Sequence, residues 1–191
     1  MKKLRYLETM AAGTLMLSKY FLAISSVYGW WLSILGYALT TIFNLKIKLK
    51  IVAIVVTGLG LLSVFGLYKW SYEIHGLQAI DFIIIGVSSI FATILIIREA
   101  KAKRPFWILQ SIATIAFTVA FITLGMKLNI GWYALLIGHI NNMYLYYKNK
   151  AYIVATMQVV SIIIVLVKLL GWKKSTESEH FCSDFFIMIE K

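Results

Sequence analysis

Long apolar stretches alternate with short polar breaks along almost the whole chain. The stretches approach the roughly 20 residues that a helix needs to cross a hydrocarbon core about 30 Å thick. The breaks are basic or contain glycine, as in "NLKIKLK" at 44–50 and "REAKAKRP" at 98–105. The pattern predicts seven transmembrane helices, at 10–27, 30–43, 51–67, 77–97, 106–124, 132–146 and 152–170.

Composition agrees with a chain whose solvent is lipid. Of its 191 residues, 61% are hydrophobic and 14% are charged, whereas an average soluble domain has about 25% charged residues. A soluble domain of this size has too little interior to bury so much apolar surface. No strand-like alternation recurs, and lipid requires a backbone whose hydrogen bonds are satisfied internally. The sequence therefore predicts an all-α integral membrane protein.

Basic residues divide unevenly between the two ends of the predicted spans. Twelve lie on the side of the amino terminus: Lys2, Lys3, Arg5, Lys46, Lys48, Lys50, Arg98, Lys101, Lys103, Arg104, Lys148 and Lys150. Six lie on the other side: Lys69, Lys127, Lys168, Lys173, Lys174 and Lys191. The positive-inside rule therefore predicts a multi-pass protein of the inner (plasma) membrane with a cytoplasmic amino terminus. Because the net charge of +11 is scattered over short loops, nucleic acid is not expected as a partner.

One stretch of the chain is repeated. "GWWLSILG" at 29–36 returns as "GWYALLIG" at 131–138, an offset of 102 residues. Without a gap, the same offset pairs Lys46 with Lys148, Lys48 with Lys150, "IVA" at 51–53 with "IVA" at 153–155, and Trp70 with Trp172. Ten of the 42 positions from 29 to 70 are identical. The offset indicates an internal duplication.

The duplication predicts how the spans are organised. Residues 1–70 form a first three-helix bundle, 71–103 a linker helix, and 104–174 a second three-helix bundle. After three spans the chain is on the opposite side of the membrane, so a second copy that followed directly would be inverted. The extra fourth span returns the chain to the first side, and the two copies then have the same orientation. The predicted fold is thus a 3+1+3 arrangement of parallel repeats about an axis along the membrane normal. Residues 175–191 are too short to span and are predicted to be a flexible or interfacial tail.

A 3+1+3 chain with parallel repeats resembles the SWEET superfamily. The Gly-Trp opening of the second span, the basic turn after it, "AYIVATMQVVS" at 151–161 and "GW" at 171–172 resemble PnuC-type vitamin transporters more specifically. The resemblance covers about residues 6–174. It implies a carrier of nicotinamide riboside or a related vitamin that works by facilitated diffusion, with no ATPase and no cofactor.

One motif departs from the PnuC pattern, which typically has two tryptophans three residues apart, followed by an asparagine, at the start of the fifth span. Here "RPFWILQS" at 104–111 supplies only Trp107. Arg104 stands in the earlier tryptophan position and Ser111 in the asparagine position. The departure bears on which substrate is carried and leaves the expected fold unchanged.

Polar side chains inside a span are costly and usually face a bundle interior or a cavity. One face of the sixth span carries four aromatic or polar residues, and the second span has four equivalents. These predicted substrate-binding residues are Trp132, His139, Asn142 and Tyr146, and Trp30, Tyr37, Thr40 and Asn44. Aromatic rings suit a planar base, and amides and hydroxyls suit a ribose. We expect the two faces to meet near the midplane.

Gln110 and Gln158 complete the predicted substrate-binding set. Structural roles compete with this interpretation, because tryptophans at span ends can form an aromatic belt and amides can join helices. Lys19 and Asp81 are strongly charged residues inside predicted spans, and Asp81 could pair with Lys19.

The leading functional hypothesis is therefore a membrane transporter for a nucleoside-like or vitamin substrate. A sugar or other small-solute carrier on the same fold is one alternative, and a non-transporting assembly or sensor protein is another. No nucleophile elbow, phosphate loop, paired carboxylates or zinc-type histidine motif is present, so neither an enzyme nor a metal site is expected. The expected partners are a small-molecule substrate and the lipid bilayer, and a homo-oligomer is left open.

Overall fold

The computed structural model describes residues 2–47, 50–74, 78–102, 106–149 and 151–189. Within these residues the chain forms seven helices and no strand. The helices are α1 (Lys2–Ala23), α2 (Tyr28–Lys46), α3 (Lys50–Ser71), α4 (Ala79–Lys101), α5 (Trp107–Gly125), α6 (Ile130–Lys148) and α7 (Tyr152–Ile189). The all-helical prediction is confirmed for this part of the chain.

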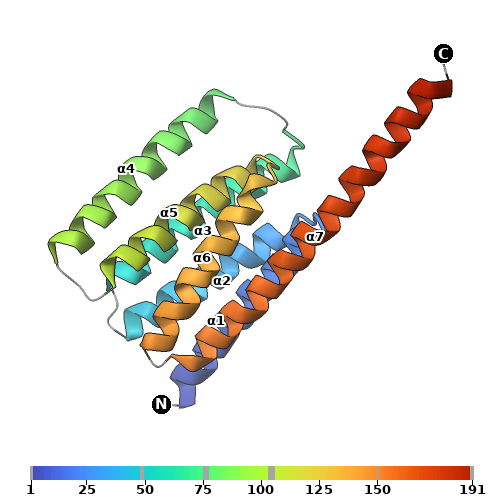
Figure 1. The fold of residues 1–191 in the computed structure, drawn as a ribbon. Coiled ribbons are helices and arrows are strands. Elements are labelled where there is room, and N and C mark those ends of the chain that lie inside the picture. The colour runs from blue at the N-terminus through green and yellow to red at the C-terminus, as the bar shows by residue number, and fades with distance from the viewer. Residues whose placement is uncertain (1, 48–49, 75–77, 103–105, 150, 190–191) are drawn as a thin grey trace.

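Six of these helices form a closed ring, and α4 lies outside it. Each of α1, α2, α3, α5, α6 and α7 packs against the next in that order, and α7 packs back onto α1. Helix α4 lies at the edge of the molecule (Figure 1), where it packs on α5 and also contacts α3. Since α1 and α3 do not contact each other, each predicted three-helix unit is a row along the ring and not a compact bundle.

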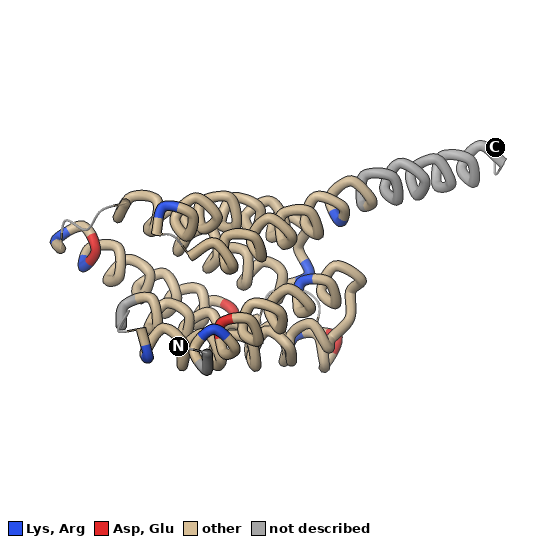
Figure 2. Tube along the Cα trace, turned by 90° about the horizontal axis from the view of Figure 1, so that it is seen from below, with Lys and Arg blue, Asp and Glu red and all other residues tan. Residues whose placement is uncertain are grey.

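Four of the seven helices in the described part of the chain contain a segment that is long and apolar enough to cross a membrane. By length and composition, four helical segments in the described residues could cross one: Val52–Ser71, Ala79–Lys101, Trp107–Gly125 and Tyr152–Gly171. Figure 2 shows that Lys, Arg, Asp and Glu are sparse along the described part of the chain. Helix α1 ends at Ala23, earlier than the predicted 10–27, and α7 includes positions 175–189, which the sequence leaves as a tail.

A left-handed residue ends the turn after α1 and the turn after α5. Ser25 has a φ of 58° and Lys127 a φ of 59°. The amide of Ser26 donates to the carbonyl of Phe21 at 2.8 Å, and the amide of Ser25 donates to Leu22 at 2.9 Å. This pair of bonds is a Schellman cap, and the turn after α5 has the same two bonds at the same lengths.

Glycines allow close helix crossings of α2 on α1 and of α6 on α5. A Cβ atom on Gly29 would lie 2.6 Å from Cγ of Leu22. A Cβ atom on Gly131 would lie 2.6 Å from Cγ of Leu124. A larger residue at either position would therefore force the two helices apart, which explains the Gly-Trp openings noted in the sequence.

A buried ion pair attaches α4 to α3. Nζ of Lys69 lies 2.8 Å from Oδ2 of Asp81, and both side chains are fully buried. The same oxygen accepts the backbone N–H of Gln78 at 2.8 Å and so caps the start of α4. Asp81 therefore pairs with Lys69, and the suggested pairing with Lys19 is wrong. Lys69 belongs to α3 and not to the loop that the sequence predicted.

Candidate substrate pathway

Two cavities open inside the ring at the end where α1 begins. The large cavity has a volume of about 430 Å³, and it lies among α2, α3, α5, α6 and α7. Four predicted site residues line it: Asn44, Gln110, Asn142 and Tyr146. Its remaining walls are mainly aliphatic and aromatic, with Thr114 and Asn149 adding polar groups. The volume is within the range of about 300–1,000 Å³ usual for small-molecule sites.

The small cavity lies beside the large one, among α1, α2, α6 and α7, with a volume of about 60 Å³. Thr40 and Gln158 line it, together with Glu8, Lys19 and Ser161. The two cavities share four lining residues, Phe43, Asn44, Tyr146 and Val154. Asn44 and Tyr146 therefore stand at the boundary between them.

A layer of aromatic side chains closes the ring interior beyond the cavities. The rings of Tyr37 and Phe121 lie 5.4 Å apart, and those of Trp30 and Phe121 lie 5.9 Å apart. His139 packs against the ring of Phe117 at 5.1 Å. Trp30 is fully buried, and Tyr37 and His139 are almost so. This packed layer belongs to the main core of the protein and separates the cavities from the opposite end.

One hydrogen bond joins the aromatic layer to the small cavity. Nδ1 of His139 lies 2.5 Å from Oε1 of Gln158, which reaches across from α7. The other ring nitrogen of His139 and the indole nitrogen of Trp30 are buried with no hydrogen-bond partner among the described residues.

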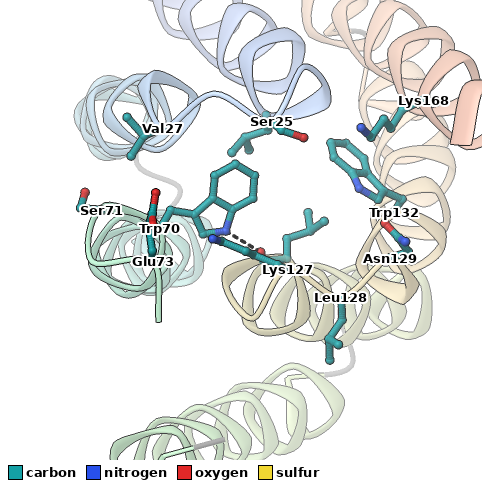
Figure 3. Close-up of a pocket in the computed structure, with 12 residues that line it drawn as sticks. Ser25, Val27, Trp70, Ser71, Glu73, Lys127, Leu128, Asn129, Trp132 and Lys168 are labelled. Carbon is teal, nitrogen blue, oxygen red and sulfur yellow. Dashed lines mark hydrogen bonds between the residues drawn. The ribbon is translucent and has the colours of Figure 1, made fainter. Parts of the chain in front are cut away.

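At the other end of the ring lies a vestibule of about 480 Å³ (Figure 3). Trp132 and Trp70 face its interior, and Lys127 and Lys168 lie at its sides. Nε1 of Trp70 donates to the carbonyl of Leu124 at 3.0 Å, which holds that ring in place. Nζ of Lys127 lies 5.9 Å from the centre of the Trp70 ring. The ring interior thus has polar space at both ends and an aromatic closure between them.

The model of a family described as nicotinamide mononucleotide transporter matches residues 5–174. The chain belongs to this family. Membership makes it a multi-pass membrane transporter for a nicotinamide-related substrate, and not an enzyme. It also confirms the resemblance to PnuC-type transporters that the sequence motifs indicated. Comparisons with curated proteins and with solved structures found no match.

The transporter brings only some of the predicted site residues together. Asn44, Gln110, Asn142 and Tyr146 line one cavity, and Thr40 and Gln158 line the other. The remaining four do not reach these cavities: Tyr37, His139 and Trp30 are in the aromatic layer, and Trp132 is in the vestibule. An aromatic-belt role for the two tryptophans is wrong, since Trp30 is 0% and Trp132 is 5% exposed.

Several residues that line the cavities or form the aromatic layer were not predicted. Phe117 and Phe121 look like ordinary apolar residues of a span, and Trp70 was noted only as a match within the repeat. The offset of 102 contained a usable signal, because it pairs Gln110 with Glu8, and both line the cavities. No group of three His, Cys, Asp or Glu that could hold a metal occurs among the described residues. Arg104, the departure from the family motif, lies outside them.

Proposed function

We propose that the chain is a facilitative carrier for an unphosphorylated nicotinamide nucleoside, of the nicotinamide riboside type. The carrier moves its substrate through the interior of the six-helix ring by alternating access. One observation carries this proposal: the two cavities are lined by residues that correspond at the offset of 102. A duplicated pair of cavities around one axis is the arrangement that repeat-built carriers use for a central site.

The correspondence covers residues of every helix in the ring. The pairs are Glu8 and Gln110, Ala11 and Ala113, Ala12 and Thr114, Leu15 and Phe117, Thr40 and Asn142, Phe43 and Leu145, Asn44 and Tyr146, Val52 and Val154, Val55 and Met157, Val56 and Gln158, and Leu59 and Ser161. In some pairs the first residue lines the small cavity and its equivalent lines the large one, and in other pairs the reverse holds. If the ten identities in 42 positions were accidental, residues 102 positions apart would not be expected to line the two cavities in pairs.

Packing supports the same duplication. The ring contacts are unchanged when α1, α2 and α3 are exchanged with α5, α6 and α7. The two left-handed caps, Ser25 and Lys127, and the two crossing glycines, Gly29 and Gly131, are also 102 residues apart. We therefore propose seven spans in two parallel units, residues 1–70 and 104–174, linked by 71–103 and followed by 175–191. In this arrangement the amino terminus is cytoplasmic and the membrane is the plasma membrane.

The walls of the large cavity favour a nucleoside over a nucleotide. Its described lining residues include amides, hydroxyls and aromatic rings, and no Lys or Arg. A phosphate monoester carries between about −1.5 and −2 charges near neutral pH, and such a group is costly to bury without a cation. The nicotinamide ring of the nucleoside is a planar cation, which the face of Tyr146 or Phe117 would attract. Amides such as Asn142 suit the ribose hydroxyls.

The aromatic layer supports alternating access. In this structure the cavities lie at the end where α1 begins, and Trp30, Tyr37 and Phe121 separate them from the vestibule. Rocking one half of the ring against the other would open the layer to the vestibule and close the cavities. In a facilitative carrier of this kind, the substrate gradient alone sets the direction of transport.

Uptake into vesicles that contain the purified protein tests the proposal. Labelled nicotinamide riboside should enter until its concentrations are equal, whereas nicotinamide mononucleotide and a hexose should not enter. Asn142→Leu should abolish this uptake. Asn141→Leu is the matched control, because the Asn141 amide bonds its own helix at the carbonyl of Ile137 and lines neither cavity.

Two results would count against the proposal. Entry of the mononucleotide at the rate of the riboside would overturn the nucleoside assignment, and entry of the hexose would favour the sugar carrier. Unchanged uptake by a correctly inserted Asn142→Leu protein would remove the large cavity from the pathway.

A further inference from the structure

We propose that the small cavity binds one small monovalent anion of the halide class beside Lys19. The proposal concerns a ligand other than the transported solute, and it can be tested without any substrate. It rests on an unneutralised buried charge, on the hydrogen-bond donors around it, on the size of the cavity and on a comparison with the large cavity.

The charge is that of Lys19 on α1, whose side chain is 6% exposed. Its Nζ donates to the carbonyl of Leu15 at 3.3 Å. Among the described residues no carboxylate oxygen lies within 4.0 Å of Nζ of Lys19, so no direct ion pair neutralises it. Glu8 also lines the cavity, but no ion pair joins its carboxylate to Lys19. An ammonium group buried in this way needs a counter-charge, because its desolvation costs several kcal/mol.

Other groups around the cavity supply hydrogen-bond donors. Asn44 is 3% exposed, and its amide nitrogen has no partner among the described residues. Gln158 uses its Oε1 with His139, so its amide N–H groups remain to serve the cavity. The hydroxyl of Tyr146 is a third donor at the same site. A cavity that offers an ammonium and amide donors is suited to an anion.

The size of the cavity selects the class of anion. A volume of about 60 Å³ is well below the range of about 300–1,000 Å³ usual for small-molecule sites, and it is enough to hold an ion or a water molecule. A halide ion fits this space, with or without one water molecule. A nucleoside, and an organic phosphate, do not fit.

The large cavity shows that the fold does not itself require these polar groups. At the offset of 102, Phe121 corresponds to Lys19, and Val56 corresponds to Gln158. The equivalent of Ser161 is Leu59. The same backbone framework therefore accepts an apolar side chain at each position. Lys19, Gln158 and Ser161 lie on α1 and α7, which pack together, whereas their apolar equivalents lie on α5 and α3.

Thermal unfolding of the purified protein in detergent, without substrate, tests the site. Sodium chloride or bromide is compared with sodium gluconate at matched ionic strength, so that general screening is the same. A halide at ten times its Kd should raise Tm by about 3–6 °C, and the rise should saturate. Lys19→Met should abolish it, and Lys148→Met, an exposed lysine on α6, should retain it.

Each outcome decides the proposal. Absence of a saturable halide effect on the unaltered protein would mean that the cavity holds water alone and would overturn it. So would an unchanged effect in Lys19→Met. If Lys19→Met does not fold, Ser161→Leu fills the cavity while keeping the lysine, and it should also remove the effect. Nucleoside uptake that fails while the halide effect is present would refute the proposed function and leave this site intact.

Discussion

Replacement of Asp81 by Asn tests the buried ion pair that holds α4. Asn keeps an oxygen in place to accept the backbone N–H of Gln78, which lies 2.8 Å from Oδ2, so the start of α4 stays capped. The change removes the negative charge 2.8 Å from Nζ of Lys69, and both side chains are fully buried. Loss of one partner of a buried pair costs about 3–5 kcal/mol, because the other charge keeps its desolvation penalty.

That cost should be large in a thermal unfolding experiment. For a domain of this length, 1 kcal/mol corresponds to roughly 2–4 °C in Tm, so Asp81→Asn should lower Tm by about 6–20 °C. Circular dichroism in detergent measures the change. Glu73→Gln is the matched control, an exposed carboxylate near the end of α3, and it should leave Tm unchanged. The double variant Lys69→Met/Asp81→Leu should recover most of the loss. A fall of less than about 2 °C in Asp81→Asn would refute the reasoning.

Three further predictions follow from the backbone and the charges. Gly66→Ala should destabilise the protein by about 1–3 kcal/mol, since its Cβ would lie 2.4 Å from the Trp30 ring. Gly86→Ala, with open space around its Cβ, should not, and equal losses in both would contradict the packing argument. Ser25→Gly should raise Tm slightly in the same assay, because the left-handed φ of 58° favours glycine, and a lower Tm would count against it. A reporter fused after Lys174 should behave as extracytoplasmic, and cytoplasmic behaviour would mean a miscounted span.

Helix positions were predictable from the sequence because apolar stretches of span length leave few alternatives in lipid. Their ends were less predictable. Helix α1 stops at Ala23 because Ser25 adopts a left-handed cap that glycine usually provides. Helix α3 continues past the predicted end at 67, because Asp81, distant in sequence, neutralises Lys69 and lets it stay inside a helix.

For the candidate site, the sequence indicated which face of a helix carries the polar and aromatic residues. It did not indicate which of those residues lie at a cavity. Helical spacing placed Tyr37 and Thr40 on one face of α2; in the structure Tyr37 is buried and Thr40 lines the small cavity. Spacing does not say which residues of a face meet a cavity and which meet a packed aromatic layer. That division depends on Phe117 and Phe121 of α5, whose positions follow from the closing of the ring and not from any local pattern.

The position of α4 outside the ring separates the covalent link between the two units from the walls of the pathway. The contacts that close the ring are those of α3 with α5 and of α1 with α7, and α4 contributes to neither. The peptide chain between α4 and α5 could therefore be interrupted without removing a wall. Two fragments made separately, one ending after α4 and one beginning before α5, have complementary surfaces along both seams. A split transporter of this kind could be assembled on demand by bringing its halves together in one membrane.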